Sequence, residues 1–318
     1  MTKKIFISRP LPQEVLNTAA HLGEITVREN TSAMSKSEMV ESLVNYDIVL
    51  PTLGDIYSEE VFDLCEEIRT KLLANFGAGF SHINVDAASS NGIKVTNTTG
   101  AVTDATADIA MALMLMCCRR TSEGERLVRL GKWEGWHPTQ MLGFHISDKT
   151  VGIVGMGNIG KAIAERCHFG FGMQVGYFSR SPKKLKYSAK QYSSLGELAS
   201  NCDILVVAVP GGAATHHLID QKIFASMQSH AYFVNIARGD IVKETDLIEA
   251  LRSKKIAGAG LDVYEFEPKV PEELMEMENV VLLPHLGTAS LEVRLGMGLM
   301  AVENIKSFLS GTELPNLV

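Results

Sequence analysis

The chain has 318 residues, of which 46% are apolar and 21% charged, and its formal net charge is −7 at pH 7. That composition is typical of a globular protein, and the length allows two domains with separate cores. The negative charge argues against a general affinity for nucleic acid or anionic lipid. No apolar run approaches the roughly 20 residues of a membrane helix, and the N-terminal run is too short for a secretory signal.

The five cysteines are odd in number and lack the spacing of metal ligands. We therefore expect reduced thiols, a cytoplasmic location and no bound metal.

Over the first hundred residues, strand-like segments alternate with helix-like ones. The segments K-I-F-I-S, E-I-T-V, Y-D-I-V-L-P, K-L-L-A-N-F and I-K-V-T-N are typical of strands, and E-V-L-N-T-A-A-H-L has apolar residues at helical spacing. This alternation predicts a parallel sheet covered on both faces, in a small domain that ends near Asn97.

The next segment, Asp104 to Arg120, reads as one long helix that is apolar nearly all round, so we expect it to be buried. Gly131 to Gly143 contains Trp133 and Trp136 and is interpreted as an extended arm. Together they indicate a domain junction or a subunit interface, and the sequence leaves both open.

A second alternating series begins at Lys149 with T-V-G-I-V-G, M-Q-V-G-Y-F and D-I-L-V-V-A-V-P. A closing helix, from about Ala289 to Ser310, is expected to pack back on the first domain.

The segment G-M-G-N-I-G, from Gly155 to Gly160, follows an apolar strand and opens a helix. This is the context that a dinucleotide-binding turn requires. The same residues with Lys161 also fit the start of a phosphate loop for nucleoside triphosphates, but Ala162 replaces the Ser or Thr that would ligate magnesium. A dinucleotide is therefore favoured, with its pyrophosphate at the helix N-terminus.

The turn after the next strand distinguishes the two nicotinamide cofactors. It contains Ser179, Arg180 and Ser181 and no acidic residue. An acidic residue would hold a free ribose 2′-hydroxyl, whereas an arginine accommodates a 2′-phosphate. A solvated basic loop is the alternative. We predict NADPH over NADH.

Three further predicted strands each lead into a different polar residue: Arg238, Glu267 and His285. Ligands of open parallel sheets bind outside the carboxyl ends of the strands, so these side chains are expected to converge. Arginine suits a carboxylate, and an imidazole can deliver a proton near neutral pH. A carboxylate beside the imidazole would favour the imidazolium and fix its orientation. Taken singly, each residue also fits a surface ion pair or a turn.

Six ordered blocks resemble the D-isomer-specific 2-hydroxyacid dehydrogenase family over nearly the whole chain. They are N-F-G-A-G-F-S-H-I-N (75–84), T-D-A-T-A-D-I-A (103–110), G-M-G-N-I-G (155–160), N-I-A-R-G-D (235–240), G-L-D-V-Y-E-F-E-P (260–268) and L-P-H-L-G-T-A (283–289). The resemblance implies an α/β fold of two doubly wound parallel-sheet domains with the active site in the cleft between them. The expected domains are a Rossmann cofactor domain, 99–288, and a smaller flavodoxin-like substrate domain, 1–98 with 289–318.

The resemblance also implies roles for individual residues. The expected catalytic residues are Arg238, Glu267 and His285, and the expected substrate contacts are Arg238, His285 and the backbone of Gly77, Ala78 and Gly79. The expected cofactor contacts are Thr103 and Asp262 near the nicotinamide, Val209 and Pro210 near the adenine, the turn residues Gly155, Met156, Gly157, Asn158, Ile159 and Gly160, and in addition Ser179, Arg180, Ser181, Thr215, Ile236, Ala237 and Gly287. Family members usually form homodimers through the long helix and the arm.

Within the family, the Ser179-Arg180 pair and P-G-G-A-A-T-H-H-L-I look most like NADPH-dependent glyoxylate/hydroxypyruvate reductases. Ser81 and Thr99 depart from residues that are frequent in the family, which makes the substrate less secure than the reaction type.

Two alternatives stay open. One is another D-2-hydroxyacid dehydrogenase, acting on a longer or phosphorylated 2-oxo acid or using NADH. The other is a non-catalytic dinucleotide-sensing scaffold similar to dehydrogenase-like corepressors, against which the intact trio argues.

Overall fold

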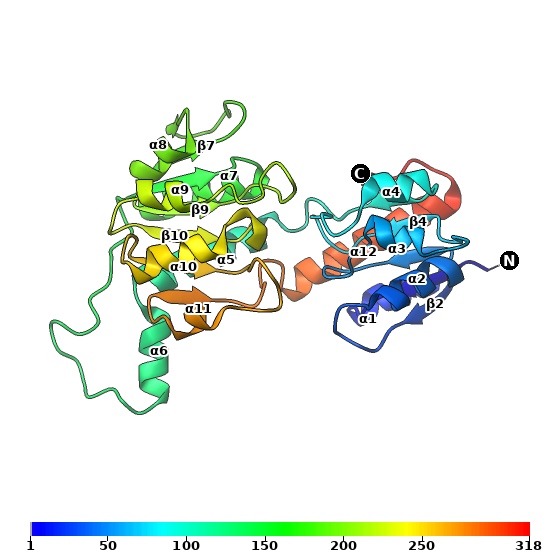
Figure 1. Ribbon diagram of the computed structural model, residues 1–318, viewed down its shortest axis with the longest axis horizontal. Coiled ribbons are helices and arrows are strands. Elements are labelled where there is room, and N and C mark those ends of the chain that lie inside the picture. Colours follow the sequence, from blue (N-terminus) through cyan, green and yellow to red (C-terminus); the bar gives the residue numbers. More distant parts are fainter. Residues whose placement is uncertain (1) are drawn as a thin grey trace. The chain divides into compact units, whose positions relative to one another are not determined.

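The computed structural model describes residues 2–318, which form two compact units (Figure 1). Unit 1 contains the described residues up to Val102 together with Ala289–Val318, and unit 2 contains Thr103–Thr288. Each unit is built on one fully parallel sheet. The α/β fold with two parallel sheets, predicted from the alternation of segments, is confirmed.

Unit 1 has five strands in the order β2-β1-β3-β4-β5, which is the flavodoxin-like order. Its elements are β1 (Lys4–Ile7), α1 (Gln13–Ala20), β2 (Glu24–Val27), α2 (Lys36–Asn45), β3 (Ile48–Leu50), α3 (Glu59–Asp63), β4 (Leu72–Ala74), α4 (Val85–Ser90), β5 (Lys94–Thr96) and α12 (Leu291–Ser310). The predicted closing helix is α12, and it packs on α1 and β4 within this unit.

Unit 2 has seven strands in the order β12-β11-β10-β9-β6-β7-β8. The order reverses between β6 and β9, and this switch point is where open α/β sheets bind their ligands. Its strands are β6 (Thr150–Val154), β7 (Gln174–Phe178), β8 (Ala189–Gln191), β9 (Ile204–Val207), β10 (Tyr232–Asn235), β11 (Gly258–Leu261) and β12 (Val280–Leu282).

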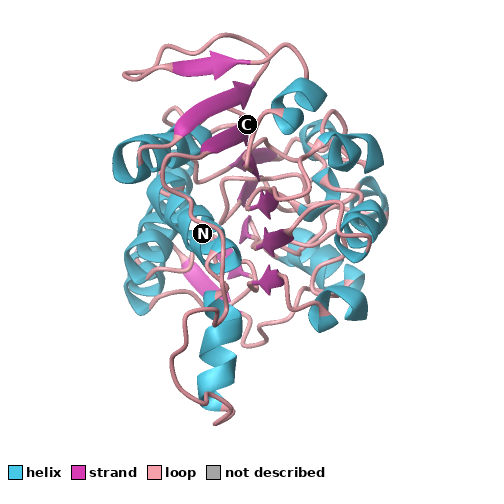
Figure 2. Ribbon diagram, turned by 90° about the vertical axis from the view of Figure 1, so that its left-hand side faces the viewer, coloured by secondary structure: helices cyan, strands magenta, loops and turns pink. Residues whose placement is uncertain are grey.

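Helices cover both faces of the sheet in unit 2, as Figure 2 shows. One core joins the sheet to α5 and α7, and the other joins it to α8, α9 and α10. The helices are α5 (Thr103–Cys118), α6 (Thr121–Arg129), α7 (Asn158–Glu165) with a π-helical continuation (Arg166–Gly170), α8 (Leu195–Ser200), α9 (Gln221–Ser226), a 3-10 turn (Gly239–Ile241), α10 (Glu244–Arg252) and α11 (Glu272–Glu276).

The long apolar helix is α5, and its Ala107, Ala110, Leu113 and Met114 are fully buried. It ends at Cys118, two residues before the predicted end, because Arg120 has a left-handed φ of 54°. The chain then forms α6, which has no buried residue. None of the helices in residues 2–318 is long and apolar enough to cross a membrane.

Candidate active site

The dinucleotide turn occupies the carboxyl end of β6 in unit 2. Gly155 has φ +97°, and a Cβ there would lie 2.6 Å from the carbonyl oxygen of Ala208. A Cβ at Gly160 would overlap the Gly155 carbonyl, so only glycine lets α7 approach the turn this closely. By contrast, a Cβ at Gly157 would meet nothing within 4 Å. The open space lies beside the start of α7, whose first turn has no side-chain cap.

The other residues of the turn divide between core and surface. Met156 is buried in the core under α5 and α7, whereas Asn158 is exposed and Ile159 is half-buried. A hollow of about 470 Å³ adjoins the same helix start. Its lining includes Thr103, Asn158, Lys161, Lys184, Lys186 and Tyr187. Thr103, the first residue of α5, is thus placed next to the turn.

The turn after β7 presents the basic residues that were predicted to select the cofactor. The Ser179 hydroxyl donates to the carbonyl oxygen of Ser181 (2.7 Å), and the carbonyl oxygen of Ser179 accepts from the Gln191 side chain (3.0 Å). Arg180 is exposed, and Lys183 Nζ lies 2.9 Å from the Ser181 hydroxyl. The turn after β7, the strand next to β6, therefore carries two cations, Arg180 and Lys183, and the hydroxyls of Ser179 and Ser181.

The loop after β9 contains the predicted residues Val209, Pro210 and Thr215. It is closed by a hydrogen bond of 2.7 Å from the Thr215 hydroxyl to the carbonyl oxygen of Pro210. A Cβ at Gly211 would lie 2.9 Å from Cγ of Arg238. The loop therefore packs directly against the arginine that follows β10.

Arg238 is held by the buried end of β10. Ile236 and Ala237 are 5% and 8% exposed, so the chain stays in the core until the arginine itself. The Asn235 side chain accepts from the Ala237 N–H (3.0 Å) and donates to the carbonyl oxygen of Arg238 (2.9 Å). Arg238 Nη1 donates to the carbonyl oxygen of Ala237 (2.6 Å). These contacts fix the backbone and the guanidinium together.

His285 and Glu267 form a hydrogen-bonded pair. His285 Nδ1 lies 2.9 Å from Glu267 Oε2, and the two side chains are 26% and 32% exposed. The other carboxylate oxygen accepts from the Tyr264 N–H (3.1 Å). An ionised carboxylate only accepts hydrogen bonds, so Nδ1 is the donor to Glu267. Within residues 2–318, Nε2 has no hydrogen-bond partner.

Asp262 fixes the backbone on which His285 stands. The N–H groups of Leu286 and Gly287 donate to its two carboxylate oxygens at 2.6 and 2.8 Å, and the His285 N–H donates to its carbonyl oxygen at 2.9 Å. His285 has φ +54°, a conformation that is costly for a residue with a side chain. The three hydrogen bonds to Asp262 stabilise this strained conformation, a function that the sequence did not suggest.

The charges of the cluster influence one another. Burial alone would raise the pKa of Glu267, but the bond from His285 and the charge of Arg238 outweigh it, so this pKa lies below the ordinary 4.5. Burial lowers the pKa of Arg238, and the nearby charges of Glu267 and Asp240 oppose that shift. Burial raises the pKa of Asp262 against its two backbone hydrogen bonds. Arg238, Glu267 and His285 thus form one electrostatic cluster.

The remaining predicted residues, Gly77, Ala78 and Gly79, belong to unit 1. They form the loop after β4, and their backbone is partly exposed. Among residues 2–318, no group of three or more His, Cys, Asp or Glu side chains is arranged to hold a metal.

Comparison with known proteins shows the family. The model of the D-isomer specific 2-hydroxyacid dehydrogenase NAD-binding domain matches residues 111–287. A glyoxylate reductase of Thermococcus kodakarensis is 38% identical over 324 residues, covering 100% of this chain and 96% of that protein. The chain belongs to the D-isomer specific 2-hydroxyacid dehydrogenases.

Solved structures of similar proteins agree with this 2-hydroxyacid dehydrogenase fold. A protein from Thermus thermophilus has a TM-score of 0.91 at 37% identity, with 99% of both chains covered. An NADPH-dependent glyoxylate/hydroxypyruvate reductase of Sinorhizobium meliloti, solved with NADP and malonate, has a TM-score of 0.89 at 31% identity, covering 100% of this chain and 97% of that one.

One contact of this dehydrogenase that sequence reasoning missed involves Glu265, whose backbone lies against Gly239. His217 Nε2 is 2.6 Å from Glu265 Oε1, and Glu265 Oε2 accepts from the Glu244 N–H (3.1 Å). The pair joins the loop after β9 to the segment after β11. The two adjacent histidines in the sequence were the available signal. The partner of His217, Glu265, is 48 residues away.

The lowered pKa of Glu267 predicts a pH-dependent contribution to stability. We expect the stability advantage of wild type over Glu267→Gln to be complete at pH 7 and to shrink as the pH falls below about 4.5. The sign follows because a group with a depressed pKa in the folded state stabilises only while it is ionised. Urea unfolding of both proteins between pH 7 and pH 4 measures it, with Glu249→Gln on the surface of α10 as a control for net charge. If the stability difference between wild type and Glu267→Gln does not change with pH, the pKa of Glu267 is not lowered by folding.

Proposed function

We propose that this protein is an NADPH-dependent reductase of small 2-oxo acids of the glyoxylate and hydroxypyruvate type, forming the D-2-hydroxy acid. The observation that carries the proposal is the cluster of Arg238 with the Glu267–His285 pair. It follows strands β10, β11 and β12 of the sheet whose β6 leads into the dinucleotide turn. A fixed cation and a proton-exchanging imidazole are what the reduction of a 2-oxo acid requires.

The dinucleotide turn has the features that a bound cofactor needs. Open space at Gly157 admits a pyrophosphate, and the uncapped first turn of α7 offers N–H groups to it. When bound, the reduced nicotinamide supplies a hydride to C2 of the substrate and becomes oxidised. Residues of the turn and the loops after β7 and β9 would hold the cofactor, and Asp262, Thr103 and Gly287 remain proposed contacts of its nicotinamide half.

Arg238 is assigned to bind the substrate carboxylate and to polarise the ketone. Its guanidinium is half-buried and stays charged, and its fork matches two oxygen acceptors. As the hydride arrives, negative charge develops on the ketone oxygen, and a preorganised cation stabilises that charge without reorganisation. The Gly77–Gly79 backbone is proposed as a second holder of the carboxylate.

His285 is assigned as the general acid. Its Nε2 proton passes to the oxygen that becomes the alcohol, and the ring is left neutral. Glu267 holds Nδ1–H throughout, which keeps the ring in one orientation and stabilises the imidazolium before transfer.

The substrate class is tested by kcat/KM across a panel of 2-oxo acids, because specificity is a ratio of those values. With NADPH held at saturation, we expect glyoxylate and hydroxypyruvate to give the highest values. If only long or phosphorylated 2-oxo acids are reduced, the small-substrate proposal is wrong. Tight NADPH binding without oxidation by any member would favour a non-catalytic sensor instead.

The preference for NADPH is supported by the turn after β7. Arg180 is exposed and the Ser181 hydroxyl faces Lys183, so two cations and a hydroxyl are available to a ribose 2′-phosphate. No carboxylate occurs between Gln174 and Lys190 to repel that phosphate.

Arg180→Asp is therefore expected to weaken NADPH binding by about 10- to 100-fold and to leave NADH binding equal or tighter. Quenching of protein fluorescence gives both Kd values without turnover. Lys222→Asp, on the surface of α9, makes the same change of net charge and should alter neither value. If the Arg180 variant keeps its NADPH preference, the 2′-phosphate is recognised elsewhere.

We further propose a cytoplasmic homodimer. The five cysteines are free thiols, which suits a reducing compartment. The segment from α6 through the arm exposes Val128, Leu130, Trp133, Trp136 and Leu142, which are between 53% and 80% exposed. Such a patch is typical of a protein interface. Light scattering should give twice the chain mass of 34.7 kDa. A monomer in dilute solution would remove the dimer proposal.

A further inference from the structure

In the loop from Gly77 to Phe80, the carbonyl oxygens of residues 77–79 all accept hydrogen bonds from asparagine side chains. The Asn75 side chain donates to the carbonyl oxygens of Gly77 (3.0 Å) and Gly79 (3.1 Å). The Asn97 side chain donates to that of Ala78 (3.1 Å). The carbonyl oxygen of Gly77 also accepts from the Thr98 N–H (3.0 Å), so each carbonyl of residues 77–79 has at least one donor.

The direction of the carbonyls sets the direction of the N–H groups. In a planar trans peptide, the C=O of one residue and the N–H of the next point in opposite directions. The carbonyls of Gly77 and Gly79 are bonded to Asn75, so the N–H groups of Ala78 and Phe80 point away from Asn75. In the same way, the N–H group of Gly79 points away from Asn97. In the described part of the chain, none of these three N–H groups has a hydrogen-bond partner.

A cation lies near the residue that precedes the loop. Arg294 of α12 lies over the ring of Phe76, with Cζ 6.0 Å from the ring centroid. Phe76 directly precedes the loop, so a positive charge occurs in the same part of unit 1 as these three N–H groups. This combination suits an anion such as a carboxylate.

His82 sets the orientation of the Asn75 amide. Asn75 is fully buried, and its Oδ1 lies 3.0 Å from His82 Nε2. Because Oδ1 only accepts, His82 is the donor, and the amide cannot rotate without losing this bond. Both Asn75 hydrogens are thereby directed to the carbonyls of Gly77 and Gly79.

We propose that Asn75, oriented by His82, is a positioning residue that holds the 77–80 loop with its N–H groups ready for the substrate carboxylate. The inference rests on the proposed function, and it names which side chains create the anion site. Asn75 acts through the backbone and does not itself touch the substrate.

The first test uses Asn75→Ala. We expect KM for glyoxylate and the Kd for oxalate to rise together by about 10- to 100-fold, because two hydrogen bonds to the loop are lost. The Kd for NADPH should stay within about twofold and kcat should fall much less than kcat/KM, since the reacting groups of unit 2 are unchanged. Oxalate binding to the NADP-loaded protein, measured by calorimetry, needs no turnover.

Asn84→Ala is the matched control. Asn84 caps α4 by accepting from the Ala87 N–H, so its loss costs stability of a similar kind without touching the 77–80 loop. Wild-type KM and oxalate affinity are expected for this variant. Equal effects of Asn75→Ala and Asn84→Ala would overturn the inference, because both would then reflect general destabilisation.

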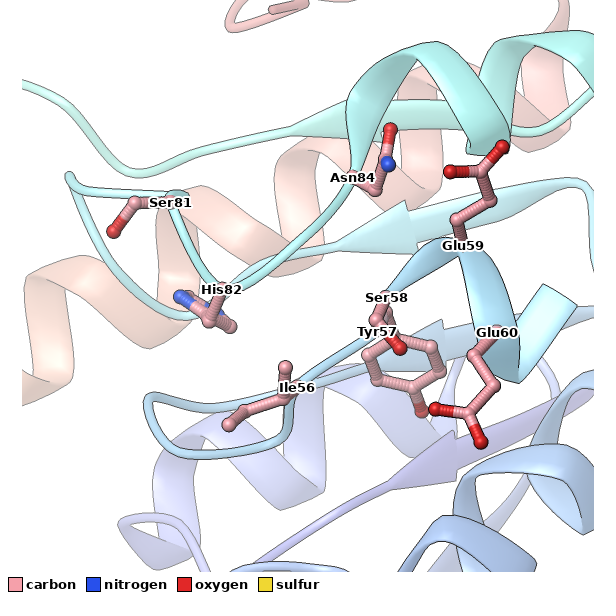
Figure 3. A pocket seen from close by; sticks show the side chains of 8 residues that line it. All are labelled: Ile56, Tyr57, Ser58, Glu59, Glu60, Ser81, His82 and Asn84. Carbon is pink, nitrogen blue, oxygen red and sulfur yellow. The ribbon is translucent and has the colours of Figure 1, made fainter. Parts of the chain in front are cut away.

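His82 offers a milder pair of variants if Asn75→Ala does not fold. His82 borders a hollow of about 540 Å³ together with Ser81 and Tyr57, so a change of side chain there is accommodated more easily than in packed core (Figure 3). His82→Leu removes the donor to Asn75 and should raise KM, whereas His82→Gln retains a donor and should restore most of the affinity. Equal KM values for the two variants would overturn the assigned role of His82.

Amide spectra separate this inference from the proposed function. In protein labelled with ¹⁵N-alanine and ¹⁵N-glycine, oxalate should shift the signals of Ala78 and Gly79 in wild type but not at the same concentration in Asn75→Ala. Identical shifts in both proteins would overturn the inference even if the enzyme reduces glyoxylate. Wild type that binds oxalate at these amides but oxidises NADPH with no 2-oxo acid would instead overturn the proposed function.

Discussion

Replacing His285 by alanine is expected to lower kcat for glyoxylate reduction by about 10²–10⁴-fold, with the Kd for NADPH nearly unchanged. The reason is that Nε2 is the proposed proton donor of the cluster, while Nδ1 is hydrogen-bonded to Glu267. Without the imidazole, the developing alkoxide must take its proton from water. Steady-state rates at saturating NADPH measure the loss, and fluorescence titration measures the cofactor affinity.

The chain offers a matched control for this experiment. His230 Nε2 lies 2.7 Å from Asp203 Oδ1, so it forms a second imidazole–carboxylate pair. Asp203 and His230 precede β9 and β10, which places the pair at the amino ends of the strands, at the opposite edge from the dinucleotide turn. His230→Ala should keep the wild-type kcat. A His285→Ala enzyme with kcat within about threefold of wild type would show that another group supplies the proton.

Arg238→Ala is expected to lower kcat/KM for glyoxylate by about 10²–10³-fold. The guanidinium is the half-buried cation of the cluster; the Ala237 carbonyl accepts from it, and Asn235 holds the Arg238 backbone. Alanine removes the charge that stabilises the developing oxyanion. It also removes a positive charge that lowers the pKa of Glu267.

Arg238→Lys should recover only part of this loss, because an ammonium group is a point charge that cannot bind a carboxylate through two parallel hydrogen bonds. The same exchange at Arg252, on the exposed end of α10, controls for the chemistry of the substitution. Equal kcat/KM values for Arg238→Lys and wild type would mean that charge alone matters and that the two-pronged contact is not used.

The sequence predicted most of the elements that position the site. Apolar runs located the strands, and the polar residues at their ends marked Arg238, Glu267 and His285 because parallel strands place their carboxyl ends at one edge. The glycine turn was predictable because Gly155 and Gly160 meet steric demands that other residues cannot satisfy. These signals are local, and they can be recognised without knowing which distant residues each segment contacts.

Two short elements that bury little apolar surface were not predicted. Helix α6 has only two large apolar residues, Leu127 and Val128, and neither is buried. Strand β8 has three residues and pairs only with β7 at the edge of the sheet. For both, the structure depends on contacts outside the segment.

Residues that position the catalytic ones were also missed. Asp262 was expected near the nicotinamide, and the structure adds its bonds to the N–H groups of Leu286 and Gly287. Asn235 gave no signal in the sequence, and the adjacent histidines that include His217 did not reveal Glu265 as its partner 48 residues away. Such long-range hydrogen bonds follow from the assembled fold and not from local pattern.

Transfer of deuterium from labelled cofactor tests the central claim most directly. NADPH carrying deuterium in both positions at C4 of the nicotinamide is mixed with the enzyme and hydroxypyruvate, and the product is analysed by mass spectrometry and chiral chromatography. The account predicts D-glycerate with one deuterium at C2, formed by wild type and at a strongly reduced rate by His285→Ala. Product without deuterium, the L isomer, or no product from an enzyme that binds NADPH tightly would contradict it.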